Sequence, residues 1–326
     1  MQVPVAFMIF NRPDVTEQVF REIAKSRPPK LFVIADGPRP EQPGEAQKCA
    51  ATRAVADRVD WDCEVVKNYS DVNLGCGLRV ATGVSWVFQQ VDRAVFLEDD
   101  CLPHPTFFRF CEELLERYHD DERLMHISGT NLQLGHKRGP SSYYFSHLIN
   151  VWGWASWRRA WQSFDLGVKQ WPQFRDTSWL LEILGDPRAA RYWREQFERA
   201  YQSKERWWTW DYQWNFAALV HNGLSIVPNV NLISNIGFGE DATHTKWAES
   251  RWANLPRAKM PFPLQHPPKI VRHKEADDFI VQEIVRTHLP QPETVLHRAL
   301  KEVRKVYTTA VPKSARMFLR NLRTLP

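Results

Sequence analysis

The chain has 326 residues and a mass of 38.3 kDa, which is enough to bury a full core in one large domain or two closely packed ones. Its hydrophobic content of 43% and charged content of 25% are ordinary for a soluble globular protein, and no stretch is long and uncharged enough to span a bilayer. The apolar start is too short for a signal peptide and the five cysteines show neither a zinc nor a disulfide spacing, so we expect a cytoplasmic protein.

The net charge of +5 is unevenly distributed. Residues 297–326 hold eight Lys and Arg against the single acid Glu302, which leaves about −2 for the rest of the chain. Overall charge therefore argues against nucleic acid as a partner of the main body. The basic tail also carries apolar residues and can lie on an anionic membrane surface, so we expect a peripheral contact with the inner membrane face. The alternatives are a C-terminal helix packed on its own domain and a disordered tail.

The first 130 residues alternate short apolar runs with amphipathic segments. The runs predict strands and the segments predict helices, in this order: strand Val3–Phe10, helix Pro13–Ala24, strand Leu31–Ala35, helix Glu45–Val59, strand Cys63–Lys67, helix Leu78–Gln90, strand Ala94–Leu97, helix Thr106–Tyr118 and strand Leu124–Ser128. This alternation predicts an α/β fold with a doubly wound, mainly parallel sheet and helices on both faces. Ligands of such sheets bind at the carboxyl ends of the strands.

Polar side chains follow three of these predicted strands. They are Asn11-Arg12 after the first strand, Asp36 after the second and Glu98-Asp99-Asp100 after the fourth. Three adjacent carboxylates repel one another unless a cation or hydrogen-bond donors neutralise them. Mg²⁺ or Mn²⁺ is usually shared between one or two carboxylates and a substrate phosphate. The cluster therefore predicts a metal-assisted site for a phosphate-bearing ligand, with a solvated acidic turn as the alternative.

The usual glycine-rich phosphate loops are absent from this sequence. Asn11-Arg12-Pro13 stands where a dinucleotide fingerprint would follow the first strand, and there is no P-loop. The run Asn73-Leu-Gly75-Cys-Gly77 precedes a helix but lacks the required spacing. Binding of a diphosphate would therefore depend on a metal and on side chains.

The pattern changes after residue 130, where tryptophan becomes frequent. Thirteen of the fifteen tryptophans fall between Trp152 and Trp252. The sheet pattern becomes irregular, and the segment Pro256–Pro268 is rich in proline and predicts an irregular connection. The remaining predicted elements are helices Leu180–Leu184, Arg188–Tyr201 and Asp211–His221 and strands Ser225–Pro228 and Asn231–Ser234.

Five pieces of the chain, in order over roughly residues 3–245, resemble the inverting N-acetylglucosaminyltransferase I type of nucleotide-sugar transferase, which has a GT-A fold. The pieces are Ile9-Phe10-Asn11-Arg12-Pro13, Ile34-Ala35-Asp36-Gly37, Phe96-Leu97-Glu98-Asp99-Asp100, Trp152-Gly153-Trp154-Ala155, and Ser234 to Gly239 leading to Thr243-His244. The resemblance implies three parts: a nucleotide-sugar-binding half over 1–130, an acceptor and catalytic half of the same domain over 131–254, and a C-terminal extension over 255–326.

The resemblance also implies roles for the residues at the strand ends. Asp100 would hold Mn²⁺ or Mg²⁺, which bridges the donor diphosphate, while Glu98 and Asp99 orient the donor. Asn11 and Arg12 would belong to the nucleotide site, where a guanidinium can meet phosphate oxygens, although an arginine in a surface turn is the alternative.

Asp36 would accept a hydrogen bond from the uracil N3–H, with an Asp-Gly turn as the alternative. The family carries a histidine at the position of Gly77, and Arg79 could substitute for it. Thr243 would donate to the diphosphate, and His244 would ligate the metal or donate to phosphate.

A general base must remove the proton of the acceptor hydroxyl in an inverting transfer. Asp211 is our candidate, since it lies in a tryptophan-rich run that would partly desolvate its carboxylate. The family has a second acid here, which this chain lacks, and a helix N-cap is the alternative role for Asp211. Trp154 and Trp210, with Trp152 and Trp208, are candidates for an acceptor platform, because sugar rings stack on indoles.

We therefore expect a metal-dependent glycosyltransferase that moves a sugar from a nucleotide-diphosphate donor, with a UDP-sugar favoured, to a saccharide or glycolipid hydroxyl. Inversion is expected, although sequence alone does not determine the stereochemistry. A sugar- or nucleotide-binding protein without catalysis is a second hypothesis, motivated by the altered Asp211 region. A sugar nucleotidyltransferase ranks last, because the glycine-rich loop after its first strand is missing.

Overall fold

The computed structural model describes residues 2–203, 207–238 and 251–288. The chain divides into two compact units, Met1–Glu283 and Ile284–Pro326. Only residues 284–288 of the second unit are described, so the basic tail, and with it the expected membrane contact, lies outside the described residues. The division into 1–130, 131–254 and 255–326 stays a prediction. No helix in the described part of the chain is both long and apolar enough to cross a membrane.

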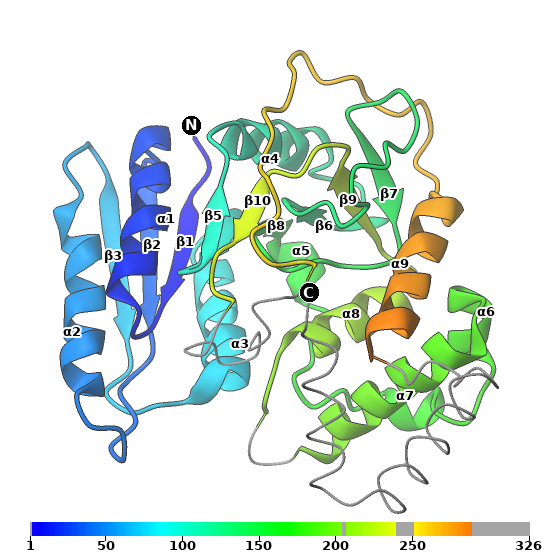
Figure 1. The fold of residues 1–326 in the computed structure, drawn as a ribbon, viewed down its shortest axis with the longest axis horizontal. Coiled ribbons are helices and arrows are strands. Elements are labelled where there is room, and N and C mark those ends of the chain that lie inside the picture. The colour runs from blue at the N-terminus through cyan, green and yellow to red at the C-terminus, as the bar shows by residue number, and fades with distance from the viewer. Residues whose placement is uncertain (1, 204–206, 239–250, 289–326) are drawn as a thin grey trace, which may run out of the picture. The chain divides into compact units, whose positions relative to one another are not determined.

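The first unit is built around an eight-stranded sheet with the strand order β3-β2-β1-β4-β8-β6-β9-β7 (Figure 1). β1, β2, β3 and β4 pair in parallel. β8 runs antiparallel to both β4 and β6, and β9 is parallel to β6. β7 pairs with β9 in antiparallel fashion. Only β8 and β7 therefore run against the common direction of this sheet, which confirms the expected mainly parallel sheet. The strands are β1 Val5–Ile9, β2 Lys30–Ala35, β3 Glu64–Tyr69, β4 Arg93–Glu98, β6 Leu124–Ser128, β7 Tyr143–Ser146, β8 Trp154–Trp157 and β9 Leu224–Pro228.

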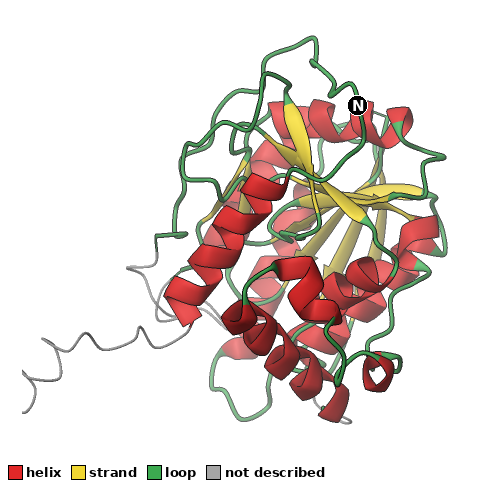
Figure 2. Ribbon diagram, turned by 90° about the vertical axis from the view of Figure 1, so that its right-hand side faces the viewer, coloured by secondary structure: helices red, strands yellow, loops and turns green. Residues whose placement is uncertain are grey.

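Helices cover both faces of this sheet, as Figure 2 shows. The alternation of side chains along β1 explains why: Val5, Phe7 and Ile9 join one buried cluster, while Ala6 and Met8 join another. Helices α1 and α4 bury apolar side chains in the first cluster, and α3 and α8 bury theirs in the second. The helices are α1 Pro13–Ser26, α2 Glu45–Val55, α3 Gly75–Phe88, α4 Thr106–Arg117, α5 Arg158–Trp161, α6 Trp179–Leu184, α7 Pro187–Gln202, α8 Asp211–Val220 and α9 Lys274–His288.

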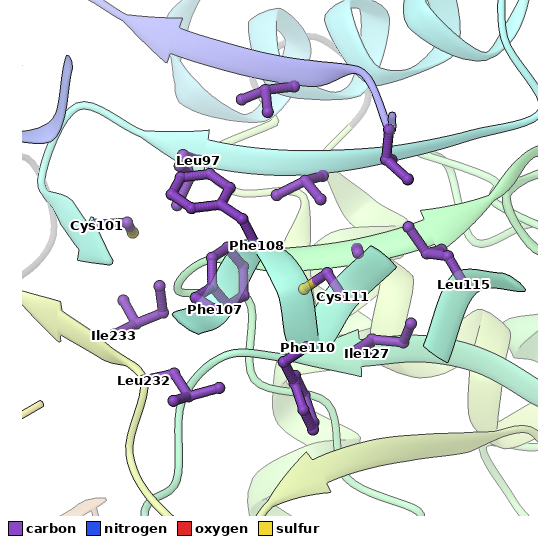
Figure 3. Close-up of a cluster of buried hydrophobic side chains, with 14 of the residues drawn as sticks. Leu97, Cys101, Phe107, Phe108, Phe110, Cys111, Leu115, Ile127, Leu232 and Ile233 are labelled. Carbon is purple, nitrogen blue, oxygen red and sulfur yellow. The ribbon is translucent and has the colours of Figure 1, made fainter. Parts of the chain in front are cut away.

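A second, two-stranded sheet pairs β5 (Cys101–Pro103) with β10 (Ile233–Asn235) in antiparallel fashion. The apolar cluster behind it is shown in Figure 3, where Leu97 of β4, Phe107 of α4 and Ile233 of β10 converge. All three side chains are buried. This packing supports the end of β4 and the turn into β5, where the three consecutive acids lie.

Several elements differ from those expected. The helix predicted to run from Glu45 to Val59 ends at Val55 and continues as a short 3-10 turn. The short strands β5, β7 and β8 and the helix α9 were not expected from the sequence pattern. Strand β8 is only four residues long and reads Trp-Ala-Ser-Trp, so it lacks the alternation that predicts a strand.

Candidate active site

The carboxylates of Glu98, Asp99 and Asp100 lie at the carboxyl edge of the parallel part of the sheet. Glu98 is the last residue of β4, and the two aspartates form the turn into β5. The backbone N–H of Ile236 donates to the carbonyl oxygen of Asp100 at 2.9 Å, so the segment after β10 lies against this turn. The expected gathering of the three acids at a strand end is therefore present in the fold.

Arg12 joins the acidic turn from the end of the neighbouring strand β1. Its Nη2 donates to Asp99 Oδ1 and, at 2.9 Å, to Asp100 Oδ2. Burial alone would lower the pKa of Arg12, but the charges of Asp99 and Asp100 outweigh burial and raise it. One guanidinium thus bridges two carboxylates, and the alternative of an arginine in a free surface turn does not fit this arrangement.

Gly237 closes over this ion pair. A Cβ at this position would lie 2.6 Å from Arg12 Nη1 and closer still to Asp100 Oδ2, so no larger residue fits without displacing the pair. The backbone N–H of Gly237 donates to Asn235 Oδ1 at 2.9 Å. A short Gly-containing loop therefore forms one wall of the acidic site.

The surroundings of Glu98 oppose the ionisation of its carboxyl group. Burial, together with the charges of Asp100 and Asp99, raises the pKa of Glu98 to about 8. Asp211 also raises it, so the Asp211 carboxylate faces the same region from the start of α8. Burial raises the pKa of the Cys76 thiol well above its usual range, and the charges of Glu98, Asp211 and Asp100 raise it further. The start of α3, which carries Cys76, therefore faces these acids as well.

The loop before α8 positions Asp211. The hydroxyl of Thr209 donates to Asp211 Oδ1, and Gln213 Nε2 donates to the carbonyl oxygen of Thr209 at 2.9 Å. Trp210 is the residue at the N-cap, and its side chain makes no capping hydrogen bond. The N-cap role considered for Asp211 is therefore wrong, since Asp211 is the first residue inside the helix. Its half-buried side chain is held by Thr209 within the acidic region.

Gly77 explains why this chain has no histidine at the start of α3. A Cβ there would lie 2.8 Å from the carbonyl oxygen of Thr209 and closer still to that of Trp207. The backbone of the loop before α8 occupies the space in which a side chain at position 77 would lie. Two backbones approach closely at this position, which only glycine permits.

Asp36 and Arg79 are committed to protein partners, which corrects the expected contacts with the nucleotide base. Asp36 Oδ1 accepts from the backbone N–H groups of Gly37 and Leu74, each at 2.9 Å, and Oδ2 accepts from that of Gly75 at 2.9 Å. Arg79 Nε donates to the carbonyl oxygen of Ala35 at 3.1 Å, and its Nη2 binds Asn68. Asp36 holds the start of α3, and Arg79 braces the ends of β2 and β3.

Glu45 and Arg39 also lie at this edge, and neither was expected from the sequence. Asn11 Nδ2 donates to Glu45 Oε1 at 2.8 Å, and the buried Glu45 also accepts from Arg39, whose Nε lies 3.0 Å from Oε2. Hydrogen bonds from Arg39 lower the pKa of Glu45. The Asp-Gly-Pro-Arg39 loop after β2 is the only sequence signal for this group. The Asn11 amide is thus oriented by Glu45 beside Arg12.

Trp154 and Trp210 do not form an open platform, which corrects that expectation. They are 0% and 2% exposed. The Trp154 ring stacks on Phe96 at a centroid distance of 4.4 Å, on His126 at 5.3 Å and on Trp210 at 5.5 Å. Aromatic neighbours therefore cover the faces that a sugar ring would need.

His126 lies in the same aromatic cluster and gives a pH prediction. Trp214 Nε1 can only donate, so His126 Nδ1 accepts its hydrogen bond at 3.2 Å, and His126 Nε2 donates to the carbonyl oxygen of Asn150 at 3.0 Å. The neutral ring satisfies both partners. Burial lowers the pKa of His126 to about 3 in the folded protein. Below about pH 6.5 the unfolded chain therefore protonates this histidine, while the folded chain keeps it neutral until the pH approaches 3.

Acidification should therefore weaken the fold through His126. The stabilisation is complete above about pH 6.5 and is lost as the pH falls toward 3, by roughly 2 to 3 kcal/mol between pH 6.5 and 4.5. Urea unfolding of wild type and His126→Gln across this pH range measures it. The wild type should lose more stability on acidification than the variant does, and parallel pH dependences would contradict the assignment.

The described acids fit a hard divalent cation that takes most of its ligands from substrate and water. No group of three His, Cys, Asp or Glu within the described ranges could hold a metal by itself. Glu98 and Asp100 offer only oxygen donors; burial and the neighbouring acids raise the pKa of Glu98, and a cation beside it would favour its ionised form. Thr243 and His244, the other expected ligands of metal and diphosphate, lie outside the described residues.

Comparison with known proteins identifies no family. No protein-family model and no curated protein matches this chain. The matching solved structures include an apo UDP-glucose pyrophosphorylase (TM-score 0.35, 8% identity, 71% of this chain and 93% of that chain). Others are a UDP-glucose pyrophosphorylase complexed with UDP-glucose (0.26, 10%, 45% and 62%) and a 4-diphosphocytidyl-2C-methyl-D-erythritol synthase from Anaerococcus prevotii (0.30, 8%, 48% and 72%). The match thus spans less than two thirds of the UDP-glucose-bound chain, and likenesses this weak carry no argument about activity.

Proposed function

We propose that this protein is a metal-dependent glycosyltransferase that uses a nucleotide-diphosphate sugar, with a UDP-sugar favoured, and a saccharide or glycolipid acceptor. The observation that carries the proposal is the gathering of four carboxylates, Glu98, Asp99, Asp100 and Asp211, at the carboxyl edge of a mainly parallel sheet beside one arginine, Arg12. The ordered resemblance to the N-acetylglucosaminyltransferase I type supports the same assignment.

The proposed chemistry divides the acids between two tasks. Asp211 accepts the proton of the acceptor hydroxyl as that oxygen bonds to the anomeric carbon, and the bond from this carbon to the diphosphate oxygen breaks. The nucleoside diphosphate leaves with the bonding electron pair. Asp211 suits the role of base because Thr209 orients its carboxylate in a partly desolvated position.

The remaining acids and Arg12 would hold the donor. Glu98 and Asp100 are the residues that would hold Mn²⁺ or Mg²⁺, which when bound supplies Lewis-acid stabilisation of the leaving diphosphate. The partly accessible guanidinium of Arg12 can donate to phosphate oxygens from the end of β1. Asp99 keeps Arg12 in place through their ion pair, and the backbone N–H of Phe10 holds Asp99 Oδ2 at 3.3 Å.

The released product separates the two transferase classes. We expect the protein, supplied with a UDP-sugar, Mn²⁺ and a panel of saccharides, to release UDP and to form a glycoside whose anomeric configuration is inverted by NMR. A nucleotidyltransferase would instead release pyrophosphate from a nucleoside triphosphate and a sugar 1-phosphate. That second result, or nucleotide binding without any turnover, would contradict the proposal.

A further inference from the structure

A cavity of about 590 Å³ lies on the surface of α7, away from the acidic turn. Its lining is strongly charged and comes from the second half of α7 and the loop before α6: Arg175, Asp176, Arg194, Glu195, Glu198, Arg199, Gln202 and Ser203. Three arginines face three acids, so the formal charge alone is balanced. The acids and the arginines differ, however, in how far they are engaged with partners among the described residues.

Each acid in the cavity already has a partner. Asp176 pairs with Arg175 at 3.3 Å, and Glu195 pairs with Arg191 outside the cavity at 2.9 Å. Glu198 accepts from Trp171 Nε1 at 2.8 Å and from Gln202 Nε2 at 2.7 Å.

Two arginines in the cavity make no ion pair with any described residue. Arg194 makes only a long hydrogen bond of 3.4 Å to the carbonyl oxygen of Thr177. The guanidinium of Arg199 lies over the ring of Trp208 at 4.2 Å. Two cationic groups in one hollow, with the nearby acids engaged elsewhere, favour a ligand that carries negative charge.

The cavity is connected to the proposed catalytic base by a short chain of ring contacts. Beyond Arg199, the rings of Trp208 and Tyr212 lie 5.3 Å apart, and Tyr212 follows Asp211 at the start of α8. The hydroxyl groups of Tyr212 and Tyr192 lie 2.6 Å apart, which ties α8 to α7. The arginine side of the cavity is therefore joined through Trp208 and Tyr212 to the start of α8, which carries Asp211.

We propose that this cavity binds an anionic group, a carboxylate or a phosphate, of the acceptor saccharide, and that Arg194 and Arg199 select such acceptors. The acceptor role rests on the proposed function, whereas the binding of an anionic sugar does not. The two guanidinium groups supply charge-assisted hydrogen bonds to the anion.

The test compares glucuronate, glucose 6-phosphate and glucose as probes, titrated against the full chain by tryptophan fluorescence and calorimetry. Each anionic sugar that fits should bind at least about tenfold more tightly than glucose, since a charged hydrogen bond contributes more than a neutral one. The two anionic probes distinguish a carboxylate from a phosphate. Equal binding of all three sugars would overturn the proposal.

Matched variants locate the effect. Arg194→Gln, whose side chain makes little contact with the protein, should remove most of the preference even if Arg199→Gln disturbs packing on Trp208. Arg188→Gln makes the same charge change at the other end of α7 and should retain the preference. Persistence of the preference in the double variant R194Q/R199Q would refute the site.

A third variant separates this proposal from the proposed function. Asp100→Ala should leave the preference for anionic sugars unchanged, because Asp100 does not line the cavity. If no nucleotide binds while the preference for anionic sugars holds, the proposed transferase function and the acceptor role are refuted, and the proposal of an anion site is retained. If nucleotides bind and transfer proceeds without any such preference, the anion site falls.

Discussion

Asp211→Asn should lower the rate of sugar transfer by roughly 10²–10⁴-fold while leaving donor binding intact. An amide cannot take up the proton of the acceptor hydroxyl, so the step that this carboxylate assists loses its base. The amide oxygen can still accept the hydrogen bond from Thr209, and the backbone of Asp211, which accepts from Asn215 Nδ2 at 3.0 Å, is unchanged. The variant therefore tests chemistry with little disturbance of the fold.

The measurement is single-turnover transfer together with calorimetric donor binding. Asp60→Asn is the matched control, since Asp60 is exposed and far along the chain from the acidic site. Its rate should equal that of the wild type. A wild-type rate in Asp211→Asn would remove Asp211 from the mechanism and leave the protein without an identified base.

Gly77→Ala should lower transfer by about 10²-fold, although it replaces glycine with a better helix former. Alanine in place of glycine normally stabilises a helix by about 1 kcal/mol. Here the added Cβ would overlap the carbonyl oxygens of Trp207 and Thr209. The loop before α8 must then move, and with it Asp211, and a displacement of about 1 Å can cost 10²-fold in rate.

Gly167→Ala provides the control for this substitution. Its Cβ would lie 3.6 Å from Asp165 Oδ1, which is ordinary contact, so its transfer rate should not change. Donor binding and transfer by both variants, with circular dichroism to check folding, separate a local shift from a lost fold. Full activity in Gly77→Ala would show that the loop can move without affecting the chemistry.

The parallel strands and their polar ends could be predicted from local pattern. Short apolar runs bounded by turns read as buried strands, and parallel strands bring Arg12 and Asp100 to one edge. The insertion of β8 between β4 and β6 could not be predicted, because pairing between strands distant in sequence leaves no local periodicity. The order of strands and helices along the chain therefore predicts the part of the site that lies at the ends of the first strands.

The roles of individual side chains needed the tertiary structure. An Asp-Gly pair reads equally as a turn and as a ligand contact, and only the neighbouring backbone N–H groups show that Asp36 holds α3. Tryptophan suits both a core and a sugar platform, and the stacking of Phe96 and His126 on Trp154 places that ring in the core. The sequence around Gly77 likewise does not indicate that the loop before α8 packs against this residue.

The most direct measurement is a calorimetric titration of UDP and UDP-sugars into wild type and Asp100→Asn, with Mn²⁺ and with EDTA, and with Asp60→Asn as control. The account predicts binding that requires the metal in the wild type and the control and that weakens by at least about tenfold in Asp100→Asn. A nucleotide that binds equally well in EDTA and in Asp100→Asn, or no binding of any nucleotide to the wild type, would contradict the assignment of the acidic strand end as a donor site.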